Sequence, residues 1–366
     1  MSRDFNNLAN LGVQKLHPYQ AGKPVSELER ELGISHIVKL ASNENPLGIS
    51  DNVKQAIQNE LTDACRYPDA NGHYLKAALS ERHNIEANQI TLGNGSNDVL
   101  EMIAKIFVQS HHEVIFAEHA FCVYPIVCQA LGAKLVEVPA KNWGNDLDAM
   151  LAAITPSTKM IFIANPNNPT GTWLASDELK RFASQVPKDV ILVIDEAYTE
   201  YVTDGSIPNS IEWLSEFDNL VVTRTYSKAY GLASLRLGYS VSNPSICGLM
   251  NRVRQPFNVN SIALAAGIAA LEDHDYLAKA ISVNRAGMQQ LVESCQQLDL
   301  QYIPSAGNFL TINMAQDAMP IYQKLLHKGV IVRPVANYKM PNHLRVSIGL
   351  EHENQKYIDA LQEVLS

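Results

Sequence analysis

The sequence lacks the long hydrophobic segments that mark a membrane protein or a secreted precursor. No apolar run reaches the length of a bilayer-spanning helix. The first seven residues are mostly polar and contain no apolar signal-peptide core. Basic residues are also scarce, with 29 Lys and Arg against 38 Asp and Glu, for a net charge of −9. We therefore expect no membrane anchor and no nucleic-acid partner, although a local basic pocket is compatible with this balance.

Cysteine is rare, and the five cysteines form no CxxC pair. Their odd number and scattered positions indicate free thiols in a reducing compartment rather than a disulfide framework. The eleven histidines lack the spacing of metal ligands, and the adjacent His111 and His112 would point to different faces of a helix or strand. We therefore expect a cytoplasmic protein without a bound metal.

The chain has 366 residues, which is more than a domain with a single hydrophobic core usually contains. We therefore predict two domains. Residues 1–30 are expected to form an N-terminal arm with a short helix, packed with the smaller C-terminal domain. Residues 31–260 alternate apolar strand patterns with helical patterns, as expected for a large α/β domain with a mainly parallel sheet between helices. Residues 261–366 are expected to form the smaller α/β domain.

The periodicity of apolar residues places the individual elements. Strands are predicted at 37–40, 89–92, 113–116, 134–138, 159–163, 190–194, 220–224, 238–241, 302–303, 309–312, 330–333 and 343–347. Helices are predicted at 98–107, 261–271, 276–298, 319–328 and 351–365.

Lys228 is the most informative residue, because it follows the apolar strand 220–224 within Thr-Tyr-Ser-Lys-Ala-Tyr-Gly. A lysine in this place leaves a buried strand and faces a cleft. Asp195 closes another apolar strand, and Arg236 lies eight residues after the lysine. This combination suggests a Schiff-base lysine that holds pyridoxal phosphate.

The segment 93–98, Gly-Asn-Gly-Ser-Asn-Asp, follows a strand and opens a helix. Its glycines allow close approach of a ligand, and the free N–H groups of a first helical turn attract an anion. A phosphate cup is therefore one interpretation. A plain tight turn, with Ser96 or Asn97 as the helix cap, is an equally good one.

Polar residues near strand ends could bind the remaining atoms of such a cofactor. Asp195 could pair with a pyridinium nitrogen, since a buried carboxylate needs a partner, although a helix cap is the default for an isolated aspartate. Tyr198 and Asn168 could hydrogen-bond the phenolic oxygen of the ring. For the segment around Asn168, a purely structural turn is the alternative.

Aromatic and basic residues offer further contacts. Phe121 could stack on a pyridine ring, whereas ordinary core packing fits Tyr124 better. Arg333 and Arg345 lie at or within late strands and could bind a carboxylate or phosphate in a two-pronged pair. A salt bridge on an edge strand is the alternative for these arginines.

Taken together, the motifs resemble those of fold-type I pyridoxal-phosphate aminotransferases, and within that class those of the histidinol-phosphate aminotransferases. The resemblance runs from His17 to the C-terminus. The motifs that carry it are 42–48 (SNENPLG), 66–69 (RYPD), 93–98 (GNGSND), 167–171 (NNPTG), 195–198 (DEAY), 227–229 (SKA) with Arg236, and 344–346 (LRV).

The resemblance implies a role for each matching residue. Lys228 would carry the covalent link to the cofactor, Asp195 would pair with the pyridine nitrogen, and Asn168 and Tyr198 would contact its O3′ atom. The implied phosphate ligands are Gly95, Ser96, Asn97, Thr225, Ser227 and Arg236. Phe121 departs from the pattern, because many members carry tyrosine there, and phenylalanine has no hydroxyl to form a hydrogen bond from this position.

The resemblance also implies a homodimer, because Tyr67 would reach the cofactor phosphate of the neighbouring subunit. Tyr19, Asn45, Arg333 and Arg345 match positions that contact substrate.

The implied reaction moves an amino group from histidinol phosphate to 2-oxoglutarate, which yields imidazole-acetol phosphate and glutamate in histidine biosynthesis by a ping-pong mechanism. Lys228 would act as base and then as acid. An aromatic amino acid aminotransferase and a threonine-phosphate decarboxylase on the same scaffold are the alternatives.

Overall fold

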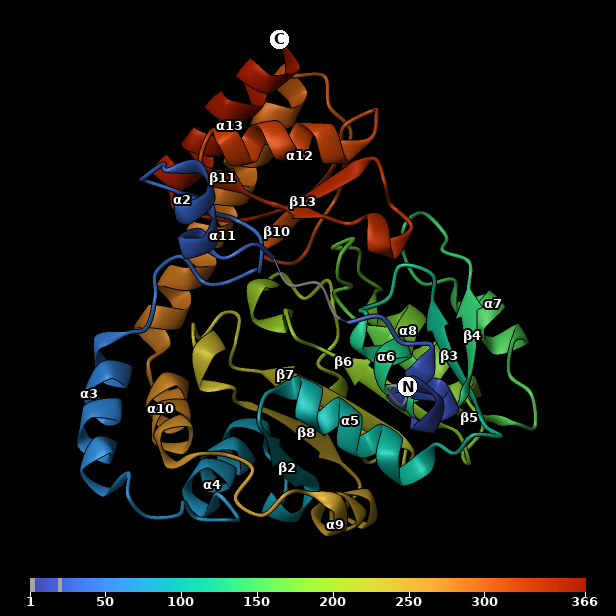
Figure 1. Ribbon diagram of the computed structural model, residues 1–366. Helices are drawn as coiled ribbons and strands as arrows, with labels where there is room; N and C mark the ends of the chain where they lie inside the picture. Colours follow the sequence, from blue (N-terminus) through green and yellow to red (C-terminus); the bar gives the residue numbers. More distant parts are fainter. Residues whose placement is uncertain (1–3, 19–21) are drawn as a thin grey trace.

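The computed structural model describes residues 4–18 and 22–366. Over these residues, a large mixed sheet lies between layers of helices, and a smaller sheet with its own helices lies beside the carboxyl ends of the large sheet (Figure 1). None of the helices in the described ranges is long and apolar enough to span a membrane.

The larger sheet has the strand order β2-β8-β7-β6-β5-β3-β4. Only β8 runs antiparallel to its neighbours, so the sheet is mainly parallel, as predicted. Its strands are β2 (Ile90–Gly93), β3 (Glu113–Ala117), β4 (Lys134–Val138), β5 (Thr158–Ala164), β6 (Ile191–Asp195), β7 (Leu220–Thr225) and β8 (Gly238–Ser242).

The central strands are buried on both faces because helices cover both sides. Alternate side chains of a strand point to opposite faces, and β6 shows this directly. Leu192 and Ile194 lie in one hydrophobic cluster, and Val193 lies in the other. Helices α5, α6 and α9 contribute to the second cluster, whereas α4, α7, α8 and α10 contribute to the first. This covering explains the continuous apolar runs in the sequence.

The five helices whose positions were predicted, now α5, α10, α11, α12 and α13, lie within a few residues of those positions. The α-helices are α1 (Leu11–Gln14), α2 (Val25–Leu32), α3 (Asp51–Glu60), α4 (His73–His83), α5 (Ser96–Phe107), α6 (Val123–Ala130), α7 (Leu147–Ala152), α8 (Ser176–Gln185), α9 (Pro244–Val253), α10 (Ser261–Glu272), α11 (His274–Gln297), α12 (Ala318–His327) and α13 (Glu351–Leu365). Short 3-10 helices are η1 (Phe5–Leu8), η2 (Leu61–Asp63), η3 (Ala87–Gln89), η4 (Thr199–Tyr201), η5 (Ser210–Trp213), η6 (Ala233–Leu235) and η7 (Ala336–Tyr338).

The smaller sheet has the order β12-β13-β10-β9, and a separate pair joins β1 to β11. Helices α11, α12 and α13 and part of α2 surround the core on this side. These strands are β1 (Val38–Lys39), β9 (Tyr302–Ile303), β10 (Phe309–Asn313), β11 (Val330–Ile331), β12 (Arg333–Pro334) and β13 (His343–Ser347).

Two local expectations differ from the structure. The segment 330–333 was expected to be one strand, but it divides: β11 pairs with β1, and β12 pairs with β13. The N-terminal arm contacts both units rather than the C-terminal unit alone. Leu28 of α2 lies in the core of the smaller unit, whereas α1 contacts α6 of the larger one.

The two sheets are linked next to the turn that follows β5. The backbone N–H of Ala306 donates to the carbonyl of Gly171 over 2.9 Å, and the hydroxyl of Thr311 donates to the carbonyl of Pro169. Gly171 has φ of 81°, and a Cβ atom there would lie 2.2 Å from Oγ of Ser305. The close approach therefore requires glycine, and it brings the smaller sheet over the carboxyl ends of β5 and β6.

Candidate active site

A cavity of about 190 Å³ lies where the carboxyl ends of β5, β6 and β7 face β12 and β13. This edge is the expected binding site of an open α/β sheet. The residues that line it include most of those predicted from the sequence: Ser96, Asn97, Phe121, Asn168, Asp195, Tyr198, Thr225, Ser227, Lys228, Arg236, Arg333 and Arg345.

Lys228 extends into the cavity from the segment after β7. Its Nζ atom donates to the carbonyl of Ser42 over 3.2 Å and lies 5.7 Å from the centre of the Tyr198 ring. Burial, together with the positive charge of Arg345, lowers the pKa of Lys228 to about 7. With this pKa, about half of the amine is neutral at pH 7, so it can act as a base or nucleophile near neutral pH.

Asp195 ends β6 and is 5% exposed. Its two carboxylate oxygens accept hydrogen bonds from Tyr124 over 2.8 Å and from the hydroxyl of Thr223 over 3.0 Å. Burial raises the pKa of the Asp195 carboxyl, and these two hydrogen bonds oppose that rise. A cationic group in the cavity would stabilise the ionised form of this carboxyl.

The first turn of α5 and the end of β7 form one wall of the cavity. Ser96 and Asn97 begin α5, so free backbone N–H groups lie at this wall. Arg236 donates from Nη1 to the hydroxyl of Ser227 over 3.2 Å. Gly95 has φ of 86°, and a Cβ atom there would lie 2.4 Å from Nη2 of Arg236. Donors and a fixed cation at a helix N-terminus suit an anion such as phosphate.

The turn after β5 contains three asparagines with different surroundings. Asn165 hydrogen-bonds the backbone of Leu174 through both ends of its amide. Asn167 donates to the carbonyl of His119 over 3.0 Å and thus also fixes the turn. Asn168 lines the cavity, and its Oδ1 atom accepts from Nη1 of Arg345 over 2.6 Å.

Two arginines face each other on the smaller sheet. Arg333 of β12 is the register partner of Arg345 of β13, and both are more than nine-tenths buried. Like charges directly opposite each other destabilise a sheet, and an anion bound between the two guanidinium groups would reduce that repulsion. Arg345 also donates from Nη2 to the carbonyl of Ala41 over 2.8 Å.

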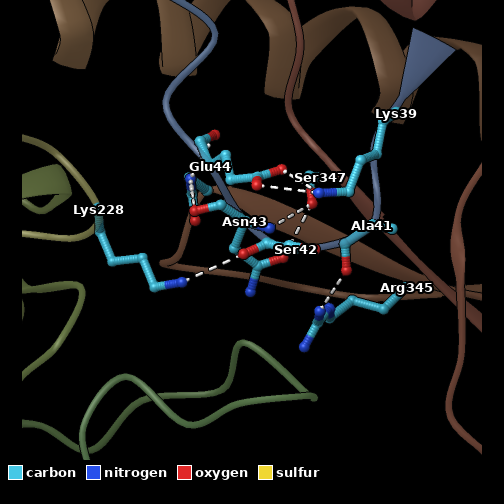
Figure 2. Close-up of polar contacts among 9 residues, drawn as sticks. Lys39, Ala41, Ser42, Asn43, Glu44, Lys228, Arg345 and Ser347 are labelled. Atoms are coloured by element: carbon cyan, nitrogen blue, oxygen red, sulfur yellow. Dashed lines mark hydrogen bonds and ion pairs between the residues drawn. The ribbon is translucent and has the colours of Figure 1, made fainter. Parts of the chain in front are cut away.

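The segment 41–44 lies between Lys228 and Arg345, which point toward it from different sides (Figure 2). Asn43 is 1% exposed and has φ of 55°. Its Nδ2 atom donates to the hydroxyl of Tyr198 over 3.0 Å, and its Oδ1 atom accepts from Ser347. Asn43 thereby connects Tyr198 of the larger unit with β13 of the smaller one.

Comparisons with known proteins decide the family. The profile of the family Aminotransferase class I and II matches residues 35–361. The chain belongs to this aminotransferase family. It is 59% identical to a histidinol-phosphate aminotransferase of Idiomarina loihiensis and 58% identical to one of Mannheimia succiniciproducens, in each case over 99% of both chains. A crystal structure of histidinol-phosphate aminotransferase from Sinorhizobium meliloti, in complex with pyridoxal-5′-phosphate, superposes with a TM-score of 0.90 at 30% identity. That alignment covers 97% of this chain and 96% of the other.

In this aminotransferase, some predicted site residues lie away from the cavity. Asn45 donates to the carbonyl of Ala229 over 2.8 Å and accepts from Leu47, so it holds the segment 42–48 against the loop that carries Lys228. Tyr67 is 82% exposed and stacks on Phe257, with ring centres 4.6 Å apart. Tyr19 lies outside the described residues.

Three residues in or next to the cavity were not predicted as site residues from the sequence. Tyr124 was expected to be a core residue. It is fully buried and stacks on Phe162, but its hydroxyl donates to Asp195. Asn43 belongs to the motif 42–48, which could have marked it as a site residue, but the sequence analysis assigned it no contact. Tyr338 of η7 lines the cavity from the smaller unit, and no pattern in the sequence marks it.

Proposed function

We propose that this aminotransferase uses pyridoxal phosphate to transfer the amino group of histidinol phosphate to 2-oxoglutarate, in the biosynthesis of histidine. One observation carries the proposal of pyridoxal-phosphate chemistry. Lys228 and Asp195 line the same cavity, and one wall of that cavity suits an anion. The choice of substrate rests on the relatives that are 59% and 58% identical, both of which are histidinol-phosphate aminotransferases.

The residues of the cavity fit pyridoxal phosphate. The buried carboxylate of Asp195 suits a protonated ring nitrogen, which would relieve the cost of burying its charge. Ser96, Thr225, Ser227 and Arg236 suit the phosphate, since they combine a helix N-terminus, hydroxyls and a guanidinium. Phe121, at the edge of the Tyr124 ring, offers an aromatic face to the pyridine ring.

When bound, pyridoxal phosphate supplies an aldehyde that takes up the amino group and a ring that accepts electrons from the α-carbon. Asp195 keeps a proton on the ring nitrogen and so maintains that electron demand. Lys228 removes the proton from the α-carbon of the substrate through Nζ and later returns a proton, which its pKa of about 7 allows near neutral pH. Asn168 and Tyr198 hydrogen-bond the phenolic oxygen of the cofactor.

The facing arginines account for two chemically different substrates. Histidinol phosphate carries a phosphate and no α-carboxylate, whereas glutamate carries two carboxylates. Arg345 and Arg333 can pair with either kind of anion because a guanidinium donates to planar carboxylates and to phosphates in similar two-pronged geometry.

The test is a panel of amino donors with 2-oxoglutarate as acceptor: histidinol phosphate, phenylalanine, tyrosine and aspartate. We expect the highest kcat/KM for histidinol phosphate and parallel double-reciprocal plots, because the first product leaves before the second substrate enters. A preference for phenylalanine or tyrosine would overturn the substrate assignment in favour of an aromatic aminotransferase. Release of carbon dioxide from threonine phosphate would favour the decarboxylase.

We further propose that the active unit is a homodimer in which Tyr67 reaches the cofactor phosphate of the partner subunit. Its exposure of 82% and its stacking on Phe257 support this, because they present a pre-oriented phenol at the surface. A cytoplasmic location is part of the proposal and is supported by five free cysteines.

The division into domains is likewise a proposal. We place the boundary after α10 rather than at residue 260. Ala263 and Ala266 of α10 belong to the core behind the larger sheet, where the helix packs against α3 and α4. Helix α11 then connects this unit with the smaller sheet (Figure 1).

A further inference from the structure

The back face of the larger sheet carries a buried ion pair directly behind the cavity. Along β6 and β7, alternate side chains point to opposite faces. Asp195 and Thr225 line the cavity on the front face. Glu196, which follows Asp195, and Arg224, which precedes Thr225, therefore point to the back.

The ion pair is made by two hydrogen bonds to one oxygen. Oε2 of Glu196 accepts from Nε of Arg224 over 3.0 Å and from Nη2 over 2.6 Å. The side chains of Glu196 and Arg224 are 1% and 10% exposed. Oε1 of Glu196 accepts from the backbone N–H of Ser210 over 2.9 Å, and Arg224 also donates to Asn209 over 2.8 Å. The pair thus joins the end of β6, the end of β7 and the start of η5.

A buried ion pair of this kind is not well explained by stability alone. The cost of removing both charges from water is comparable with their attraction, so well-packed neutral replacements are often as stable. What a guanidinium that donates twice to one carboxylate provides in addition is a restricted geometry between the backbones that carry the two side chains. Here those backbones carry Asp195 on one strand and the Thr225–Lys228 segment on the other.

We propose that Glu196 and Arg224 are positioning residues, whose ion pair fixes the distance between the Asp195 carboxylate and the Thr225–Lys228 segment. The inference rests on the proposed function, since these two groups would hold opposite ends of the same cofactor. A cofactor of fixed size must contact both, so a shift of one strand end against the other weakens one contact or the other.

A second carboxyl near Arg224, that of Glu200, helps to separate two effects of the ion pair: neutralising the charge of Arg224 and holding β6 against β7. Burial raises the pKa of Glu200 to about 7, and the charge of Arg224 opposes that rise. Glu200 can therefore ionise and balance Arg224 electrically if Glu196 loses its charge. It stands on η4, beyond the strand ends, and cannot restore the tie between β6 and β7.

The test is the double variant Glu196→Gln/Arg224→Met, studied as the holoenzyme. The new glutamine keeps an oxygen for the N–H of Ser210, and neither position retains a charge. We expect the urea midpoint to stay near that of the parent. We expect the dissociation constant of pyridoxal phosphate to rise about tenfold or more and kcat to fall about tenfold, with a smaller change in KM. The pH at which the visible absorbance of the cofactor changes should also shift.

The control is Glu113→Gln/Lys134→Met, which removes an ion pair between two strand starts in which Lys134 is exposed. Lys134 donates to Glu113 over 2.7 Å between the first residues of β3 and β4, at the end of the sheet away from the cavity. We expect this control to leave the dissociation constant and the absorbance transition unchanged. Equal changes in both double variants would overturn the proposal. So would a lower urea midpoint of Glu196→Gln/Arg224→Met with cofactor binding and absorbance like those of the parent.

If Glu196→Gln/Arg224→Met does not fold, Arg224→Lys decides, because it keeps the charge but not the planar pair of N–H donors that bind Oε2 of Glu196. We expect the dissociation constant of pyridoxal phosphate and kcat to change in the same direction as in the double variant, but by less. Cofactor binding and absorbance like those of the parent would overturn the proposal. Failure of the parent enzyme to use histidinol phosphate would refute the proposed substrate. It would leave these cofactor measurements, and thus this inference, intact.

Discussion

Arg345 of the smaller sheet donates a 2.6 Å hydrogen bond from Nη1 to Oδ1 of Asn168, which lies on the turn after β5 of the larger sheet. The same guanidinium donates from Nη2 to the carbonyl of Ala41. Because its donors are fixed in one plane, the two bonds set its orientation toward the cavity. The residue proposed to bind substrate is thus also a link between the two sheets.

Arg345→Lys is expected to lower kcat/KM about 100-fold for both the amino donor and 2-oxoglutarate, because an ammonium cannot keep both bonds and also form a two-pronged pair with an anion. Steady-state kinetics of the two half-reactions measure this. Arg285→Lys is the control, since Arg285 is bonded to Thr203 at the surface. Equal activity of the two variants would contradict the assignment of Arg345.

Gly238→Ala is expected to disturb the anion-binding wall. A Cβ atom at Gly238 would lie 2.3 Å from the backbone nitrogen of Ser96 and 2.7 Å from the carbonyl carbon of Gly95. Backbone atoms cannot rotate away, so the first turn of α5 must move. We expect a loss of about 1–3 kcal/mol in stability and at least a roughly tenfold weaker binding of pyridoxal phosphate in an absorbance titration.

Gly248→Ala is the matched control for this prediction. A Cβ atom at Gly248 in α9 would meet no atom within 4 Å. Alanine favours a helix by about 0.5–1 kcal/mol over glycine, so this variant should be slightly more stable and bind the cofactor as the parent does. Parental cofactor binding in Gly238→Ala would show that the wall tolerates the movement.

Lys228→Met should stabilise the cofactor-free protein in a pH-dependent way. The pKa of Lys228 is lowered from 10.5 to about 7 in the folded state. Below pH 7 the lysine is protonated whether the chain is folded or unfolded, and the folded state carries the full cost of the buried charge. Between about pH 7 and the ordinary lysine pKa, the folded state lacks this proton while the unfolded chain keeps it, so the cost decreases as the pH rises and vanishes above that pKa.

We therefore expect Lys228→Met to raise the free energy of unfolding by roughly 2–4 kcal/mol at pH 6. That gain should fall steadily toward pH 10. Urea unfolding of the cofactor-free parent and variant at several pH values measures it. A gain that is the same at every pH would mean that packing of the methionine, and not the charge of Lys228, is responsible.

Mixing two inactive variants tests the shared site. If Tyr67 serves the partner's cofactor, a dimer of one Lys228→Ala subunit and one Tyr67→Ala subunit has one site with both residues intact. Random exchange should then restore about a quarter of the parental activity. Mixing Lys228→Ala with Asp195→Ala should restore none, because both residues serve the site of their own subunit. Equal lack of recovery in both mixtures, with exchange demonstrated, would refute the role of Tyr67.

Much of the fold could be predicted because the strands of the larger sheet are apolar runs that end in polar residues. The structure confirms the mainly parallel sheet and places β4 (Lys134–Val138) at the predicted residues. The segment 330–333 could not be divided from its sequence. Its two halves pair with β1 and β13, and nothing local to the segment indicates that change of partner.

Lys228 and Asp195 were recognisable from the sequence alone, because Asp195 closes one buried strand and Lys228 closely follows another, where a polar side chain needs a cavity or a partner. Their proposed roles remain predictions for the experiments above. The family resemblance singled out Asn168 before the structure was known, and the structure places Asn168, but neither Asn165 nor Asn167, in the lining of the cavity. Only the tertiary structure placed Tyr124 on Asp195, Arg333 opposite Arg345, and Glu196 against Arg224. These relationships join residues on different elements, so they depend on strand register and side-chain direction, which arise only when the sheets form.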